Sequence, residues 1–328
     1  GDVYKRQEYA LDWVYRTLPD KKKIDRVSLL KDKVAFRKAS SSLHKDLFYA
    51  ELQFNELYSV KIDKLPLPIV LKPAVGFLSA SVYTITSPVD WEKALKDIRH
   101  NLAKQAIMFP DTVVDNTRFI VESYISGKEY AIDLYFNDTE PVIVNIFEHP
   151  FSSSNDVSDR LYYTSKSLFD NFLSVFTGYF KELNAVLHLK DIPVHVELRI
   201  DNGIIAPIEI NPLRFAGLCL NEIHYHICGK HPLSYFFSKT IPDYQAMWKG
   251  KETRMFCFSV FEKDMNGMIE IEEIELLFSS ILEMRIPNNP NLGIGAFVFS
   301  EIDIFDRNEI KNILQYNETP FLCYAGNV

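Results

Sequence analysis

Residues 194–211 constrain the fold more than any other stretch, because apolar and polar side chains alternate on both sides of Asn202-Gly203. Alternation with a period of two predicts β-strands, and an Asn-Gly pair predicts the tight turn of a hairpin. A three-residue loop with Gly203 in the left-handed conformation pairs Ile200 with Ile204. This register gives the hairpin an apolar face of Val194, Val196, Leu198, Ala206, Ile208 and Ile210, and a polar face of His195, Glu197, Arg199, Glu209 and Asn211.

The polar face of this hairpin brings Glu197 and Glu209 onto neighbouring strands. Two carboxylates at about 4 Å repel by about 4 kcal/mol at an effective dielectric of about 20. Three arrangements relieve this repulsion: one carboxyl is protonated, Arg199 neutralises both, or a divalent cation binds between them with Asn211 adding a carbonyl oxygen. A solvated strand face is the alternative, and a two-residue loop would place the two glutamates on opposite faces.

Composition argues against several classes of protein. The chain has 328 residues, 47% of them apolar, which is enough for two or three packed units. The net charge is −8 and the basic residues are scattered, so we expect no nucleic-acid partner. Four widely spaced cysteines predict neither disulfides nor a zinc site, and they favour a reducing, cytoplasmic location. No apolar run has the length of a membrane span, so no membrane partner is expected.

The remaining patterns predict a mixed α/β organisation. We expect helices over residues 28–43, 88–106 and 168–183, and strands over residues 69–71, 82–85, 119–122 and in a pair around Asn137-Asp138. The polar segment 149–163 is too long for a tight turn, and such segments often become active-site lids. In it, Asp156, Asp159 and Arg160 are candidates for substrate contact and His149 is a candidate general base.

Two further motifs carry residue types that suit nucleotide chemistry. Lys72 ends an apolar strand, and a loop of small residues from Gly76 to Ser81 follows it. A flexible cation and backbone N–H groups of this kind suit phosphate. Glu122 ends another strand, and a turn separates it from Glu129. Each motif alone also fits a solvent-exposed strand end or linker.

In this order, the motifs resemble the ATP-grasp superfamily, whose members clamp ATP between two α+β lobes. The resemblance covers residues 31–229, and the segment 208–217 is similar to the family's Glu-x-Asn-Pro-Arg segment. It implies an ATP-grasp fold that binds ATP with Mg²⁺ or Mn²⁺. The residues that it assigns are Lys72, Arg199 and Arg214 for catalysis, Lys33, Lys72, Gly76, Ser79, Ser81, Glu122, Tyr124, Ile125 and Glu129 for ATP, and Glu197, Glu209 and Asn211 for the metal.

The resemblance also assigns roles within these sets. Lys33 and Lys72 are expected on phosphate, with residues 76–81 as the mobile phosphate loop. Glu122 and the backbone of residues 124 and 125 are expected at adenine, and Glu129 at the ribose hydroxyls. Two positions depart from the family pattern: Leu213 is inserted before Arg214, and Ser81 stands where relatives carry glycine.

The resemblance implies a ligase that activates a small carboxylate as an acyl phosphate and joins it to an amine. A nucleotide-binding module without ligase activity and an ATP-grasp kinase acting on a hydroxyl are the alternatives. Whether the protein is a homodimer is left open.

The expected domains follow from the same resemblance. They are a remnant of an N-terminal Rossmann-like unit at residues 1–27, an ATP-grasp domain at 28–240 with a lid lobe near 65–125 and a core lobe near 126–240, and a small C-terminal α/β unit at 241–328. Residues 2–7 resemble a translated sequencing adapter and are excluded from the fold, so we expect the natural chain to begin further upstream.

Overall fold

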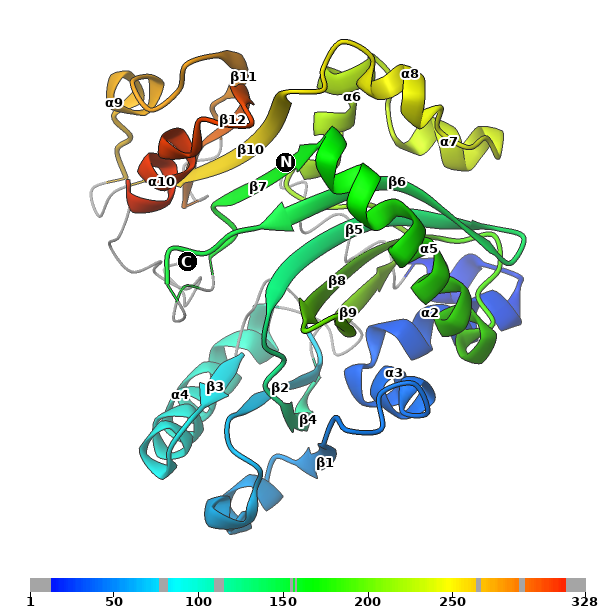
Figure 1. Cartoon of the computed structure of the whole chain (residues 1–328). Helices are drawn as coiled ribbons and strands as arrows, with labels where there is room; N and C mark the ends of the chain where they lie inside the picture. The colour runs from blue at the N-terminus through cyan, green and yellow to red at the C-terminus, as the bar shows by residue number, and fades with distance from the viewer. Residues whose placement is uncertain are drawn as a thin grey trace.

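Two antiparallel sheets organise the chain, with the smaller one below the larger one in the view of Figure 1. The computed structural model describes residues 13–76, 82–108, 115–153, 156, 158–263, 267–288 and 293–316. The smaller sheet has the strand order β1-β4-β2-β3, and the larger sheet has the order β11-β12-β10-β7-β6-β5-β8-β9. The sheets and the helices that cover them make a mixed α+β fold, as the sequence predicts.

The smaller sheet contains the predicted strands and one that the sequence analysis missed. Its strands are β1 (Tyr49–Gln53), β2 (Ile69–Val75), β3 (Tyr83–Ile85) and β4 (Asp115–Ser123), and α4 (Pro88–Met108) covers it. Leu71, Phe119 and Trp91 meet in the core between α4 and the sheet. Because β1 pairs with β4, this lobe begins before residue 65, where the sequence analysis started it.

The helix expected over residues 28–43 is two helices, α2 (Lys21–Lys31) and α3 (Lys33–Ser40). Asp32 separates them, because its backbone is extended and its side chain accepts hydrogen bonds from the amides of Val34 and Ala35. An aspartate in this position caps the N-terminus of the second helix. The break turns α3 toward both sheets (Figure 1).

The larger sheet and the helices packed on it hold most of the buried apolar side chains. Its strands are β5 (Lys128–Asn137), β6 (Glu140–His149), β7 (Leu161–Ser165), β8 (Pro193–Asp201), β9 (Ile204–Pro212), β10 (Arg254–Glu262), β11 (Ile281–Arg285) and β12 (Ile294–Asp303). Helix α5 (Lys166–Leu187) lies across it, with Phe176, Phe180 and Leu183 buried against the sheet. Val175, on the same helix, is exposed.

The strands after residue 241 extend the larger sheet, so they do not form a sheet of their own. β10 pairs with β7 on one side and with β12 on the other. Residues 255–261 of β10 are all buried, and a strand buried on both faces belongs in the interior of a sheet. The small C-terminal unit expected at 241–328 therefore shares a sheet with the core lobe.

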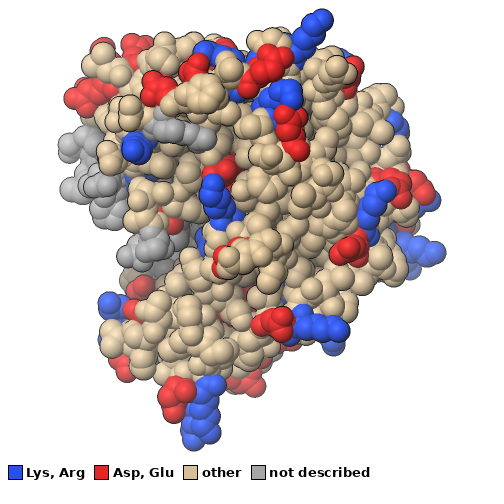
Figure 2. All heavy atoms as spheres, in the orientation of Figure 1, with Lys and Arg blue, Asp and Glu red and all other residues tan. Residues whose placement is uncertain are grey.

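Short helices complete the described chain. They are α6 (Ile223–Cys228), α7 (Leu233–Ser238), α8 (Tyr244–Trp248), α9 (Ile271–Glu275) and α10 (Arg307–Gln315), with 3₁₀ turns at Glu56–Ser59, Ile62–Lys64 and Leu220–Glu222. Across the described residues, we find no helix with both the length and the apolar content needed to cross a bilayer. Positive and negative side chains are interspersed on the face in Figure 2.

The β8–β9 hairpin reaches the expected arrangement by a different register. Its loop is the two-residue turn Asn202-Gly203, with φ of 49° and 80°, so Ile200 pairs with Ile205 and the expected pairing with Ile204 is wrong. Ile208 then forms a bulge, and beyond it Glu197 pairs with Glu209. A bulge adds one residue to one strand, which reverses the faces of everything beyond it. The two glutamates therefore share a face, while Ala206 lies opposite Arg199 and leaves the expected apolar face.

Gly127, just before β5, should not tolerate a side chain. Its φ is 100°, and a Cβ there would overlap the carbonyl oxygen of Ile200 on β8. We expect Gly127→Ala to lower the free energy of unfolding by about 2–3 kcal/mol, because strain of this kind costs about 1–3 kcal/mol before the overlap is added. Gly178→Ala, on the open side of α5, is the matched control and should be neutral or stabilising by up to about 1 kcal/mol. Equal urea-denaturation midpoints for the two variants would contradict the expectation.

Candidate functional site

Two glutamates and an asparagine form the centre of the candidate site. Glu197 on β8 and Glu209 on β9 are direct cross-strand partners, so their side chains project from the same face. Asn211 lies two residues further along β9, and its Nδ2 donates to Oε1 of Glu209 over 2.7 Å. The three residues predicted to bind metal are thus brought together.

The surroundings separate the pKa values of the two carboxyls. Burial and the neighbouring Glu209 raise the pKa of Glu197. Burial alone would also raise the pKa of Glu209, but Lys33 and the hydrogen bond from Asn211 lower it overall. Lys33 Nζ lies 3.1 Å from Oε2 of Glu209. The repulsion between the carboxyls is therefore relieved by a lysine from α3, and the sequence analysis had considered Arg199 for that role.

A buried ionic cluster joins the smaller sheet to β9. Glu122 on β4 accepts from Lys72 Nζ at 2.5 Å and from Arg37 Nε at 2.7 Å. The same two cations reach the bulge, where Arg37 Nη2 donates to the carbonyl oxygen of Pro207 over 2.9 Å and Lys72 Nζ to that of Ile208 over 3.4 Å. The bulge thus sets the pairing of Glu197 with Glu209 and also provides carbonyl oxygens that accept hydrogen bonds from the two cations.

Arg37 is the residue in this cluster that the sequence analysis missed. It is 2% exposed, and it lies four residues after Lys33 on α3. Residues separated by four positions share a helix face, so the spacing of Lys33 and Arg37 was the available signal. The helix presents both cations to the carboxylates of the two sheets.

Charge pairing keeps Glu122 ionised in this buried position. Burial alone would raise its pKa, but Lys72 and Arg37 lower it overall. The pKa of Lys72 is lowered by burial and by the nearby cations Lys33 and Arg37, against the attraction of Glu122. The cluster carries more positive than negative side chains, which suits an anionic ligand.

Arg199 contacts the hinge, the segment 124–127 that joins the two sheets. Its neighbours there are not those of the glutamate pair. Its Nε is 2.9 Å from Oε2 of Glu129, and its Nη1 donates to the carbonyl oxygen of Ile125 over 2.7 Å. The guanidinium also lies over the rings of Tyr124 and Phe151, 5.3 and 5.7 Å from their centroids. These contacts fix the hinge that was predicted to hold adenine and ribose.

The segment between β6 and β7 is anchored next to this hinge. His149 Nδ1 lies 3.0 Å from Oε1 of Glu129, and its Nε2 lies 3.0 Å from the carbonyl oxygen of Ser158. Burial alone would lower the pKa of His149, but Glu129 raises it overall. His149 stacks on Tyr162 at 4.1 Å, and Tyr162 donates to Asp159. Both ring nitrogens of His149 therefore contact other groups of the protein.

Two other residues of this segment also bond to the protein itself. Asp156 accepts from the hydroxyls of Ser152 and Ser158 at 2.8 and 2.6 Å. Arg160 Nη1 donates to the carbonyl oxygen of Leu314, on α10, over 3.1 Å. Contact of Asp156, Asp159 and Arg160 with substrate stays a prediction.

The residue inserted before Arg214 is accommodated by the backbone. Leu213 adopts a φ of 63°, and its N–H donates to the carbonyl oxygen of Pro193 over 2.8 Å. Arg214 Nη1 donates to the carbonyl oxygen of Phe215 over 3.2 Å. Burial and the nearby Arg214 lower the pKa of His195, but its hydrogen bonds to Asp133 and Glu197 raise it overall to about 9. The arginine therefore lies near the glutamate strands.

The predicted phosphate loop is described only at its first residue. The carbonyl oxygen of Gly76 accepts from Lys33 Nζ at 3.1 Å, which ties the start of the loop to the glutamate pair. Ser79 and Ser81 lie outside the described residues.

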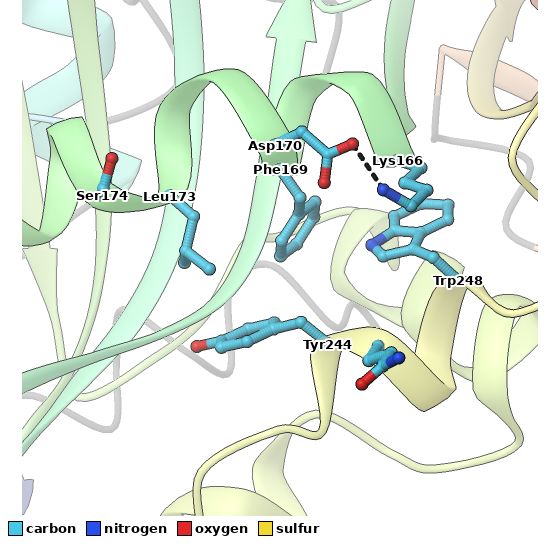
Figure 3. A pocket seen from close by; sticks show the side chains of 8 residues that line it. Lys166, Phe169, Asp170, Leu173, Ser174, Tyr244 and Trp248 are labelled. Atoms are coloured by element: carbon cyan, nitrogen blue, oxygen red, sulfur yellow. Dashed lines mark hydrogen bonds and ion pairs between the residues drawn. The ribbon is translucent and has the colours of Figure 1, made fainter.

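A separate pocket of about 340 Å³ lies between α5 and α8 (Figure 3). The aromatic side chains of Tyr244 and Trp248 face Phe169 across it. Its charged residues, Lys166 and Asp170, pair with each other at 2.5 Å. None of the predicted nucleotide or metal residues lines it, so it is distinct from the candidate site.

The donor set of the glutamate hairpin fits Mg²⁺. Two carboxylates and an amide oxygen are hard oxygen ligands, and Mg²⁺ is usually held by one or two carboxylates plus phosphates and waters. Within the described part of the chain, no group of three or more histidine, cysteine or acidic residues is arranged to hold a metal. His224 uses both ring nitrogens in contacts to Asn145 and Tyr235.

Removing the Glu122 carboxylate should destabilise the protein strongly. In Glu122→Gln, Arg37 and Lys72 lose their buried counter-charge, and breaking such a group costs about 3–5 kcal/mol. Glu140→Gln is the control, because its pair with Lys181 is exposed and worth about 1 kcal/mol or less. Urea denaturation of both variants measures the difference, and a loss from Glu122→Gln no larger than from the control would refute the expectation.

The same pair of variants gives a pH test. Because the folded-state pKa of Glu122 is lowered, its stabilisation is complete above the unfolded value of about 4.3 and is lost as the pH falls through the folded value. The stability difference between the wild type and Glu122→Gln should therefore narrow in acid.

Comparison with known proteins agrees with this geometry. Residues 65–222 match the family described as "ATP-grasp domain". The chain is similar to the structures of L-amino acid ligase from Bacillus licheniformis (16% identity, TM-score 0.62, covering 88% of this chain and 71% of that one) and biotin carboxylase from Campylobacter jejuni (11%, 0.59, 89% and 68%).

A third similar structure contains nucleotide. It is N5-carboxyaminoimidazole synthase from Aspergillus clavatus in complex with ADP and 5-aminoimidazole ribonucleotide (13% identity, TM-score 0.60, covering 94% of this chain and 78% of that one). A search of curated protein sequences gave no significant match. Residues 65–222 therefore form an ATP-grasp domain, and the described chain has the ATP-grasp fold.

Proposed function

We propose that this protein is an ATP- and Mg²⁺-dependent ligase that converts a small carboxylate to an acyl phosphate and joins it to an amine. The pairing of Glu197 with Glu209 on one face, with Lys33 and Lys72 contacting the same hairpin, carries the proposal. The similar structures of an L-amino acid ligase and a biotin carboxylase support the ligase class.

Glu197, Glu209 and Asn211 would hold the metal. When bound, Mg²⁺ supplies charge neutralisation and alignment of the phosphate oxygens. Lys33 now contacts Glu209 at 3.1 Å, so it would exchange this partner for phosphate when the glutamate turns to the metal. The lysine thus neutralises the site before the nucleotide arrives and contacts the nucleotide afterwards.

The cation cluster would bind the polyphosphate. Lys33, Arg37 and Lys72 equal in number the carboxylates Glu122, Glu197 and Glu209, so a metal ion held by the glutamate pair would leave positive charge for phosphate oxygens. Positioning and charge neutralisation are the main needs of phosphoryl transfer. The start of the loop at residue 76 would close over the phosphates.

The hinge would bind the nucleoside. The backbone of Tyr124 and Ile125 lies between the two sheets, where it would meet adenine, and Glu129 would accept hydrogen bonds from the ribose hydroxyls. Arg199 fixes both groups through its bonds to Glu129 and to the carbonyl oxygen of Ile125. We therefore assign Arg199 a positioning role at the hinge.

The reaction has two substitutions. A carboxylate oxygen of the substrate attacks the γ-phosphorus, and the bond from that phosphorus to ADP breaks. The amine then attacks the acyl carbon, the bond to phosphate oxygen breaks, and the amine gives up a proton as phosphate leaves. Arg214, beside the glutamate strands, would stabilise charge on the transferred group.

Glu209→Gln should abolish Mg²⁺-dependent ADP release, because an amide is a poor replacement for a carboxylate ligand. The assay screens pools of amino acids, small carboxylic acids and amines with ATP and Mg²⁺, and Glu140→Gln is the matched control. ADP with free phosphate and a new amide supports the ligase. A stable phosphorylated product identifies a kinase instead, and Glu209→Gln with wild-type turnover rejects the metal site.

Arg214→Met tests whether the inserted Leu213 leaves the arginine in use. Loss of one donor to the transition state costs about 100–1,000-fold in kcat. We expect a loss of this size in kcat with KM for ATP little changed, and no loss in Arg254→Met, whose arginine pairs with Glu301 at the far strands of the sheet. Equal kcat values in both variants would show that Arg214 does not act in the reaction.

A further inference from the structure

Asp133, on β5, is a buried carboxylate at the junction of three elements of the site. It is 0% exposed. Its Oδ1 accepts from His195 Nδ1 at 2.9 Å and from the backbone N–H of Ala216 at 2.7 Å, and its Oδ2 accepts from Asn145 Nδ2 at 2.8 Å. The donors come from β8, from the loop after β9, and from β6.

The pairing of the strands arranges these residues in one row. Asn145 pairs with Asp133, Asp133 with His195, and His195 with Asn211, so the four side chains cross β6, β5, β8 and β9 on one face. The row ends at a proposed metal ligand. The next row on this face contains Glu197 and Glu209.

The first arm of Asp133 reaches Glu197. His195 Nε2 lies 3.5 Å from Oε1 of Glu197, while its Nδ1 bonds to Asp133. Because a carboxylate oxygen only accepts, Nδ1 carries the proton, and the imidazole ring is fixed in place. Asp133 thus sets the orientation of the side chain next to Glu197.

The second arm reaches the loop that carries Arg214. Three residues of this loop have a positive φ: 63° at Leu213, 53° at Leu218 and 69° at Cys219. This left-handed conformation costs about 1–3 kcal/mol for each residue other than glycine. Strain of this size persists only where contacts hold it. The hydrogen bond from Ala216 N–H to Asp133 anchors the middle of this loop to the sheet.

The far end of the row fixes Asn145. Burial lowers the pKa of His224 to about 4, so its ring is neutral at pH 7. Nδ1 of His224 lies 2.8 Å from Oδ1 of Asn145, and Nε2 lies 3.3 Å from the hydroxyl of Tyr235. Nδ1 donates and Nε2 accepts in this arrangement, which leaves the Asn145 amide N–H pointing at Asp133.

We propose that Asp133 is a positioning residue for the ligase site, and that it sets Glu197 through His195 and the Arg214 loop through the N–H of Ala216. The inference rests on the proposed function. Residues that orient metal ligands from behind typically account for about 10–100-fold in metal affinity.

The test measures ATP binding by calorimetry at stepped Mg²⁺ concentrations. We expect Asp133→Ala to raise the Mg²⁺ concentration for half-maximal ATP binding by about 10–100-fold, while ATP binding in EDTA stays unchanged. If the alanine variant does not fold, Asp133→Asn takes its place. It keeps the shape of the side chain but places an amide donor opposite Asn145, so it should also raise the Mg²⁺ concentration for half-maximal ATP binding. Unshifted curves in the folded variants would overturn the inference.

A double-mutant cycle separates positioning from general stability. If Asp133 acts on Glu197 through His195, then Asp133→Ala should add little to the Mg²⁺ shift of His195→Ala, whereas independent effects would add. Asn184→Ala is the matched control, because it removes a buried side chain that bonds to Thr139 and Leu189 away from the site. It should lower the melting temperature and leave the Mg²⁺ curve in place.

Mg·ATP binding by the wild type distinguishes a failure of the positioning role from a failure of the proposed function. If the wild type binds Mg·ATP and the Asp133 variants have its Mg²⁺ curve, only the positioning role is wrong. If the wild type binds no Mg·ATP, the proposed function and the positioning role both fail. Additive shifts in the cycle would likewise overturn the route through His195.

Discussion

The carboxylates of Glu197 and Glu209, held opposite each other on adjacent strands, determine which charged residues the rest of the site must supply. Within the hairpin, His195 and Asn211 contact the two carboxylates and relieve part of the repulsion, whereas Arg199 is used at the hinge. Lys33 therefore comes from α3 to Glu209, and α3 is placed by the break at Asp32. The helix, the hinge and the smaller sheet are thus arranged around charge that the larger sheet brings together.

The bulge at Ile208 affects the strand register, the contact between the two sheets and the positions of the charged residues. It returns Glu209 to the face of Glu197 after a turn that would have separated them. It also brings the carbonyl oxygens of residues 207 and 208 to Arg37 and Lys72, which hold Glu122 of the other sheet. A single extra residue in β9 therefore serves both the pairing of the glutamates and the contact between the lobes.

Much of this arrangement is readable from sequence, and the failures have a common cause. Alternation, turn residues and helix periodicity are local, so they predicted β2, β4, α5 and the β8–β9 hairpin. The partners of Arg37, Glu122 and Pro207, lie 85 and 170 residues away, and no local pattern specifies such contacts. The same holds for Asp133, whose importance depends on three strands meeting, and for β10, which is placed by pairing with β7. The turn length failed because the compensating bulge carries no signal of its own.

The order of strands in the larger sheet has a consequence for the integrity of the chain. β7 is buried along its whole length and takes β10 as its neighbour, although residues 166–253, about half of the sequence from the first to the last strand of the larger sheet, separate them. A polypeptide that ended before residue 254 would leave an apolar strand with unpaired backbone groups at an open edge, and such edges recruit strands from other molecules. The last strands would therefore protect the half that carries the proposed nucleotide site from aggregation, even though they contribute none of its predicted ligands.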